Sequence, residues 1–203
     1  NRRRSEKSIT RQEIEALLDE CCSQRRSGIV LKVVVAGDGG VGKTSLIRRY
    51  VLDRFDPGER ITIGCDFYTK VCDTEGGLRY KFQIWDMGGQ EQFRVLLPLW
   101  SKGLRGAILT FDVGSIESYL HLDEWLAMIS DGEKSKRFPV IVVGNKTDLS
   151  NGSIGETDLV NYVAKRRLDG YYLVSAKDNT SVSTPFLGLL RLIMDRETRY
   201  GGL

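Results

Sequence analysis

The strongest constraint on the fold of this chain is a glycine-rich segment at residues 37–44 that ends in lysine and threonine. It lies between an almost uninterrupted apolar run at 29–36, typical of a strand buried on both faces, and a helical pattern at 43–52. Strand, glycine-rich turn and helix in this order predict a P-loop, whose backbone N–H groups and helix dipole surround phosphate oxygens. The alternative, a glycine-rich turn with an incidental lysine, does not explain the flanking strand and helix.

Within this loop, we expect Lys43 to contact the terminal phosphates and the Thr44 hydroxyl to ligate Mg²⁺. The residues expected to surround the nucleotide phosphates are Gly37, Asp38, Gly39, Gly40, Val41, Gly42, Lys43, Thr44 and Ser45.

Strand-like and helical patterns alternate through the rest of the chain. Two runs flank Glu75-Gly76-Gly77 and predict a hairpin, at 66–73 and 78–85. Further buried strands are expected at 106–111, 140–143 and 171–174, and helices at 116–131, 156–167 and 183–197. This alternation predicts an α/β fold: a mostly parallel sheet with one antiparallel edge strand and helices on both faces. In such folds, ligands bind at the carboxyl ends of the strands.

The first 28 residues differ from this pattern and are expected to form a tail and an amphipathic helix, followed by one α/β domain at 29–203. Thr10 and Glu13 form a capping-box pattern, and apolar side chains recur at helical spacing up to Cys21. This helix at 10–23 has three interpretations: packing on its own domain, binding a partner, or lying on a membrane surface. Its four acidic residues oppose binding to anionic lipid.

A second motif, Asn145-Lys146-Thr147-Asp148, closes the predicted strand at 140–143. Asp148 can accept two hydrogen bonds from guanine, whereas adenine has no donors there and would leave a carboxylate unpaired at a cost of about 1–3 kcal/mol. We expect Asn145 to tie this loop to the P-loop and to bond the base, and the Lys146 stem to cover one face of the base. The alternative is a helix-capping turn.

A third motif, Ser175-Ala176-Lys177, follows the predicted strand at 171–174. All three residues are expected at the base, with the Ala176 N–H donating to guanine O6. The order of these motifs on strand ends favours guanine recognition over an unrelated turn.

Two further segments carry candidate catalytic and metal-binding groups. After the hairpin, Asp86 is placed to hold Mg²⁺ through water, the Gly89 N–H to bond the γ-phosphate, and Gln90 to orient the attacking water. In the polar loop at 55–64, Thr62 is expected to ligate Mg²⁺ and sense the γ-phosphate, and Phe55 to cover the guanine edge. The catalytic set is therefore Lys43, Thr62, Gly89 and Gln90, against the alternatives of a plain strand-end turn and an ordinary loop threonine.

Together, these segments resemble the Ras superfamily of small GTPases, most closely the Rab branch, over roughly residues 30–200. The resemblance implies a six-stranded sheet with five helices, bound GTP or GDP with Mg²⁺, and effector, GTPase-activating and exchange proteins as partners. It also implies that Thr62 is the switch I threonine and Gln90 the catalytic glutamine. Phe67, Trp85 and Phe93 would form an aromatic cluster facing effectors, the alternative being ordinary packing.

Two functions follow from this resemblance: a slow GTPase switch, or a GTP-binding module that recruits partners without hydrolysing GTP. The second is suggested by Met87-Gly88, which stands where the family usually has Thr-Ala. A net charge of +3 gives no reason to expect nucleic acid as a partner. The only histidine, His121, is expected on a helix surface without a role, and four cysteines without a Cys-x-x-Cys pair argue against a zinc site.

We expect a monomer in the cytoplasm, peripheral to a membrane if it associates with one. The visible termini carry no prenylatable cysteine and give membrane association no support.

Overall fold

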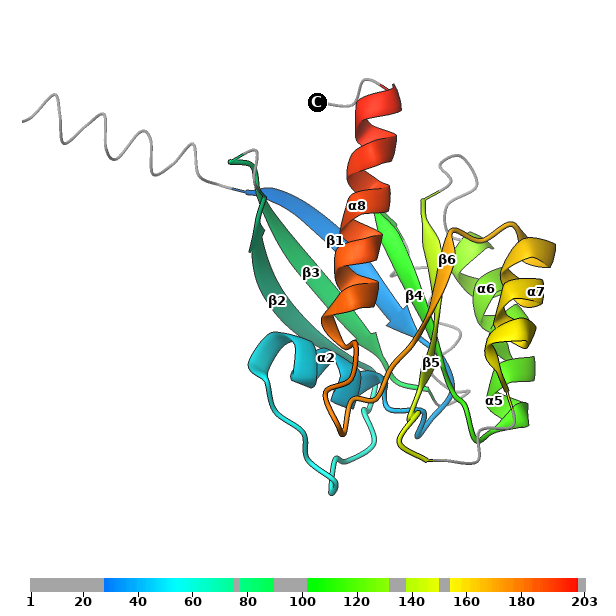
Figure 1. The fold of residues 1–203 in the computed structure, drawn as a ribbon. Helices are drawn as coiled ribbons and strands as arrows, with labels where there is room; N and C mark the ends of the chain where they lie inside the picture. The colour runs from blue at the N-terminus through cyan, green and yellow to red at the C-terminus, as the bar shows by residue number, and fades with distance from the viewer. Residues whose placement is uncertain (1–27, 75–76, 90–101, 132–137, 150–153, 201–203) are drawn as a thin grey trace, which may run out of the picture.

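The computed structural model describes residues 28–74, 77–89, 102–131, 138–149 and 154–200. These residues form a six-stranded sheet with strand order β2-β3-β1-β4-β5-β6 (Figure 1). The strands are β1 (Ile29–Ala36), β2 (Cys65–Asp73), β3 (Arg79–Met87), β4 (Gly106–Asp112), β5 (Val140–Asn145) and β6 (Gly170–Leu173). The helices are α2 (Lys43–Leu52), α5 (Ile116–Leu120), α6 (Leu122–Asp131), α7 (Glu156–Arg166) and α8 (Ser183–Tyr200).

The sheet is parallel except for the pair β2 and β3, which runs antiparallel from Cys65 opposite Met87 to Asp73 opposite Arg79. β2 is therefore an antiparallel edge strand, and the predicted mostly parallel sheet is confirmed. The hairpin that joins β2 to β3 spans the segment where the sequence predicts it.

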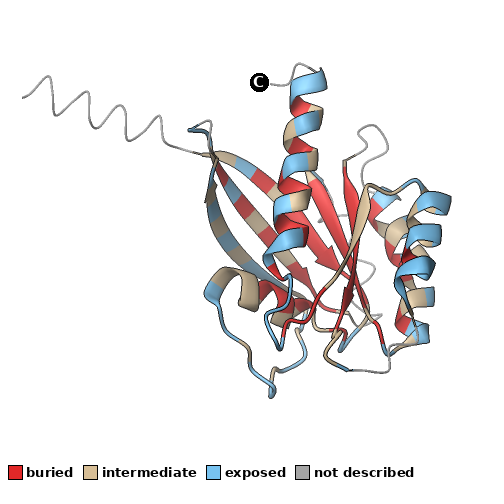
Figure 2. Ribbon diagram, viewed as in Figure 1, coloured by how far each residue is buried: buried red, intermediate tan, exposed pale blue. Residues whose placement is uncertain are grey.

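Helices cover both faces of the sheet, and β1 contributes to both cores (Figures 1 and 2). Leu31, Val33 and Val35 pack in one core with residues of α2 and α8. Val34 and Ala36 point the other way and join the core under α6 and α7. This double coverage explains why β1 is continuously apolar from Val33 to Ala36, whereas Lys32 lies nearer its start, where Val30 is half-exposed.

The predicted helix at 116–131 is two helices, with His121 between them as the C-terminal cap of α5. The backbone of His121 stays near helical geometry, at φ −72° and ψ −8°. Neither a glycine nor a proline marks the break between the two helices. The sequence pattern therefore predicts one continuous helix where the structure has two.

The predicted helix at 10–23, Gln90 and Phe93 lie outside the described residues. The division into residues 1–28 and 29–203 remains a prediction.

Candidate nucleotide-binding site

A cavity of about 440 Å³ opens beside the carboxyl ends of the parallel strands, where the loops after β1, β3 and β5 meet. Its volume falls in the usual range for small-molecule sites. Of the residues predicted to bind nucleotide, those lining this cavity are Gly39, Gly40, Gly42, Lys43, Thr44, Ser45, Phe55, Thr62, Gly89, Asn145, Lys146, Asp148, Ala176 and Lys177. Gly37, Asp38, Val41, Asp86 and Ser175 are not among its lining residues.

The loop between β1 and α2 depends on glycine at particular positions. Gly40 and Gly42 have φ of 77° and 91°, a left-handed conformation that side chains disfavour. A Cβ on Gly37 would lie 2.0 Å from the Thr110 carbonyl oxygen, so the loop passes directly against β4. Gly42 is the N-cap of α2 and accepts the first helical hydrogen bond, from Leu46 at 2.9 Å. The loop therefore ends at the positive end of a helix dipole, which favours anions.

Lys43 is buried, and its ammonium group donates to the carbonyl oxygens of Gly37 (2.8 Å) and Asp38 (2.6 Å). Burial lowers the pKa of Lys43 to about 8, against the opposing influence of the Asp86 and Asp38 carboxylates. A buried cation held by carbonyl oxygens at the cavity wall is placed to attract phosphate.

Three oxygen-bearing side chains from different elements meet beside Lys43. The Thr44 hydroxyl donates to Asp86 Oδ2 at 2.6 Å and lies 2.8 Å from the Thr62 hydroxyl. Asp86 is fully buried, and burial raises the pKa of its carboxyl group to about 6 despite the hydrogen bond from Thr44.

The other carboxylate oxygen, Asp86 Oδ1, is buried and has no hydrogen-bond partner in the described part of the chain. Two hydroxyls and one carboxylate are hard oxygen donors, and Mg²⁺ is usually held by one or two carboxylates together with waters and phosphate oxygens. Thr44, Thr62 and Asp86 therefore fit Mg²⁺.

The loops after β5 and β6 are joined through Asn145. Its side-chain NH₂ donates to the carbonyl oxygens of Val41 (3.0 Å) and Gly42 (3.3 Å), and its carbonyl oxygen accepts from the Ala176 N–H at 3.2 Å. The predicted tie to the P-loop is present. The Ala176 N–H, expected to face the base, bonds to Asn145 instead.

Asp148 lies nearby with a side chain only 7% exposed, 3.6 Å from the Lys177 ammonium group. The Ser175 hydroxyl donates to it at 2.7 Å, and this hydrogen bond is the main cause that lowers the pKa of Asp148. Asp148 is thus an ionised acceptor at the cavity wall, and Ser175 contributes by fixing its orientation.

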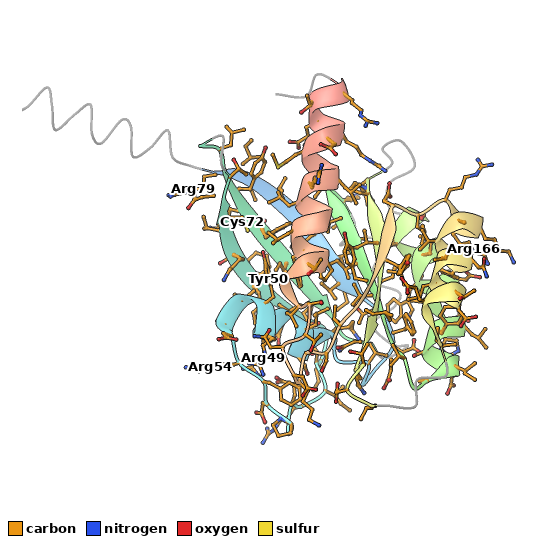
Figure 3. All side chains as sticks on the ribbon, in the orientation of Figure 1. Arg49, Tyr50, Arg54, Cys72, Arg79 and Arg166 are labelled. Atoms are coloured by element: carbon orange, nitrogen blue, oxygen red, sulfur yellow. The ribbon has the colours of Figure 1, made fainter. Side chains whose placement is uncertain are left out.

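Arg49 is a supporting residue that the sequence did not reveal. From α2, its guanidinium donates to the carbonyl oxygens of Ala176 (3.0 Å) and Lys177 (3.1 Å), which lie far along the chain (Figure 3). It thereby fastens the Ser175–Lys177 loop to the helix that follows the P-loop. A helical arginine reads as solvent-facing in sequence, so no pattern could have identified it.

The loop at 55–64 forms the outer wall of the cavity. Phe55 and Arg60 line it, and Glu59 is joined to Arg48 of α2 by an ion pair of 2.5 Å. Leu149, after Asp148, also lines the cavity and was not anticipated.

Gly89 approaches the P-loop so closely that a Cβ there would lie 2.2 Å from the Gly39 nitrogen. Only glycine fits this contact.

His121 is partly exposed at the end of α5, as expected for a helix surface, but its side chain has a partner that the sequence did not predict. Its Nδ1 lies 2.6 Å from Asp38 Oδ2, and Asp38 Oδ1 accepts from the Trp125 indole N–H at 2.8 Å. The Asp38 side chain is therefore directed to the junction of α5 and α6, although its backbone belongs to the P-loop. The sequence does not predict this contact, because the two residues lie more than eighty positions apart.

Comparison with known proteins agrees with this geometry. The family described as "Ras family" matches residues 32–195. A Ras-related protein Rab-18 from Lymnaea stagnalis is 37% identical over 164 residues, covering 81% of this chain and 80% of its own. Ras-related protein Rab-9A from Homo sapiens is 34% identical, covering 84% and 86%. Ras-related protein RABG3e from Arabidopsis thaliana is 37% identical, covering 81% and 82%.

Proposed function

The chain belongs to the Ras family of small GTPases, and on that basis we propose that it is a molecular switch that binds GTP or GDP with Mg²⁺ and hydrolyses GTP. Its similarity to Rab proteins supports a role in membrane traffic or signalling. The observation that carries the proposal is the meeting of the P-loop, the Asn145–Asp148 loop, the Ser175–Lys177 loop and the Thr44–Thr62–Asp86 cluster at one cavity.

In this proposal, the P-loop and α2 hold the phosphates, while Asp148 selects guanine by accepting from its ring N–H and exocyclic amine. Lys43 exchanges its two carbonyl partners for phosphate oxygens, which keeps its ammonium group charged. Thr44 and Thr62, with Asp86 acting through a water, would hold Mg²⁺, which would neutralise charge at the phosphates. Gln90 orients the attacking water, as the family resemblance implies.

Switching rests on two contacts that only the γ-phosphate can complete. Thr62 reaches it from the loop at 55–64, and Gly89 reaches it from the end of β3. Loss of the γ-phosphate would release both segments. Next to them, Phe67 is half-exposed and packs edge-on against Trp85 with ring centroids 5.6 Å apart, which suits an effector surface that changes with the nucleotide.

Hydrolysis also needs a positive charge to balance charge on the transferred phosphate, usually an arginine. Arg54 is exposed and points away from the fold (Figure 3), and Arg94 lies outside the described residues. Arg60 lines the cavity and is the candidate within this chain. Without a cis arginine, an activating protein must supply one, and the isolated protein would be slow.

A second candidate function is a GTP-loaded recruitment module that does not hydrolyse. Met87 is fully buried in the core, and the Gly88 N–H donates to the Gly64 carbonyl oxygen at 2.8 Å. This hydrogen bond joins the ends of the two proposed switch segments, which could hinder the reordering that hydrolysis requires.

Single-turnover phosphate release from pre-bound GTP separates the two functions. We expect slow release by the wild-type protein and slower release by Gln90→Leu, with GTP binding retained in both. An Arg60→Ala variant tests for a cis arginine, with Arg54→Ala as the matched control. If the GTP-bound wild-type protein releases no phosphate over hours, the proposed hydrolysis is wrong.

None of the described helices has both the length and the apolar character to cross a bilayer. We propose a cytoplasmic protein that acts as a monomer, attaches to membranes peripherally if at all, and has effectors, exchange factors and activating proteins rather than nucleic acid as partners.

A further inference from the structure

Asp38 is the charged residue of the P-loop whose side chain is held outside the nucleotide cavity. Both of its carboxylate oxygens are hydrogen-bonded, Oδ2 to His121 Nδ1 at 2.6 Å and Oδ1 to the Trp125 indole nitrogen at 2.8 Å. Trp125 is fully buried in the core beneath α6, whereas the His121 side chain is 32% exposed. One bond is therefore anchored in the core and the other lies near solvent.

The backbone of Asp38 occupies a central position in the proposed nucleotide site. Its carbonyl oxygen accepts from the Lys43 ammonium group at 2.6 Å. A Cβ on Gly89 would lie 2.3 Å from the Asp38 carbonyl carbon, so the end of β3 rests directly on this peptide. An interaction that fixes the Asp38 side chain therefore also fixes the Asp38 backbone, which contacts Lys43 beside the phosphates and Gly89, the proposed γ-phosphate contact.

We propose that His121 and Trp125 are positioning residues that hold the P-loop through Asp38, and that the charge on His121 sets how firmly the loop retains bound nucleotide. This inference rests on the proposed function. It adds two residues outside the nucleotide cavity and a dependence of nucleotide release on pH.

The surroundings of His121 favour its charged form. Among the described residues, the charged groups that face it are Asp38 of the P-loop, Glu117 of α5 and Glu124 of α6, all acidic. The hydrogen bond from His121 to Asp38 is the main cause that raises the pKa of His121; desolvation opposes the shift, and the charges of the three carboxylates support it.

The sign of the effect follows from this shift. Below the raised pKa, His121 is an imidazolium and its bond to Asp38 is charge-assisted. As the pH rises through that pKa, the neutral ring can still donate from Nδ1 to the Asp38 carboxylate, but the attraction between two opposite charges is lost. Nucleotide release should therefore become faster with rising pH, by about fivefold across the transition. The Trp125 bond does not titrate and should contribute equally at every pH.

The first experiment uses the fact that the chain has a single histidine. In a proton NMR titration, its ring signals report only His121. We expect the wild-type midpoint to lie above the ordinary histidine value of about 6.5 and to fall in Asp38→Asn. Equal midpoints in the two proteins would overturn the pairing.

The second experiment measures release of labelled GDP between about pH 6 and about pH 9, where histidine changes charge. The matched variant is His121→Asn, because the Asn amide nitrogen stands at the same number of bonds from Cβ as Nδ1 and donates without titrating. We expect this variant to release GDP at the fast, high-pH wild-type rate at every pH. Trp125→Phe should be faster than wild type by a factor that does not change with pH.

Lys43 and Asp86 also titrate near neutrality, but they are present in both proteins, so the difference between the wild-type and His121→Asn profiles isolates His121. Parallel profiles from proteins that bind GDP would overturn this inference and leave the proposed function standing. Failure of the wild-type protein to bind GDP at any pH would contradict the proposed function and this inference together.

Discussion

Lys43 and Asp86 are opposite charges withdrawn from water at the same place. Burial favours the neutral form of each side chain: it lowers the pKa of Lys43 to about 8 and raises the pKa of Asp86 to about 6. Desolvated charges near a cavity are typical of functional sites, because a ligand of opposite charge restores the interactions that burial removed. In the proposed site, the phosphates serve this purpose for Lys43 and Mg²⁺ does so for Asp86.

Replacing Lys43 by alanine should weaken GDP binding strongly. The change removes a charge-assisted contact worth about 1.5–3 kcal/mol, equivalent to about 10- to 150-fold in the dissociation constant. Lys165→Ala, on the exposed side of α7, is the matched control and should bind as the wild-type protein does. A Lys43→Ala protein with unchanged affinity would remove this residue from the phosphate site.

Replacing Asp148 by asparagine should shift the preferred base from guanine toward xanthine. Asparagine presents an NH₂ donor where the carboxylate accepts, and the 2-oxo group of xanthine can accept from it. The serine that orients Asp148, at 2.7 Å, remains in place to bond the amide. Competition between GDP and XDP measures the shift, and an unaltered preference for GDP would mean that Asp148 does not contact the base.

Among single residues, the sequence best predicts the roles of those that belong to a short functional motif. Asn145 makes the predicted hydrogen bonds to the P-loop, and Lys43 and Thr44 line the expected cavity. His121 and Arg49 could not be predicted, because their partners lie more than eighty residues away along the chain. Their roles exist only after the sheet has brought separate loops together.

The elements match the sequence patterns closely where buried strands and glycines mark them. α2 spans the predicted residues, and β5 extends past the predicted end to include Asn145. That extension places the first residue of the base-recognition motif inside the sheet, which fixes its position better than a loop would. The break between α5 and α6 was missed because no helix-breaking residue accompanies it.

Between elements, the contact of Gly89 with the P-loop leads to a further prediction. In Gly89→Ala, the added Cβ would lie within 2.2 Å of the Gly39 nitrogen and 2.6 Å of the Asp38 carbonyl oxygen, so the segment after β3 must move away. We expect GDP binding to be largely retained and GTP hydrolysis to be lost, since Gly89 is proposed to contact only the γ-phosphate.

Gly170→Ala is the control for this change, because its Cβ would make an ordinary contact of 3.9 Å. Phosphate release and GDP affinity should be measured for both variants. Wild-type hydrolysis by Gly89→Ala would show that closure of this segment onto the P-loop is not required.

Across the whole molecule, two apolar cores hold one sheet from opposite faces, and the proposed site lies at the strand ends, where Phe55 and Ala176 join one core to the cavity wall. Several loops that differ widely in sequence position form its walls, so a ligand that contacts all of them stabilises the folded chain as a unit. A ligand that binds only the native state adds about 2.7 kcal/mol at a hundredfold excess over its dissociation constant. For a chain of this size, that corresponds to a rise of about 5–10 °C in the melting temperature.

The most direct test of guanine-nucleotide binding is the thermal unfolding of the nucleotide-stripped protein with GDP or ADP, each with Mg²⁺. GDP should raise the melting temperature by about 5–10 °C at a hundredfold excess over its dissociation constant, ADP at the same concentration should leave it nearly unchanged, and chelation of Mg²⁺ should reduce the GDP effect. Equal stabilisation by ADP and GDP, or no stabilisation by either, would contradict the account.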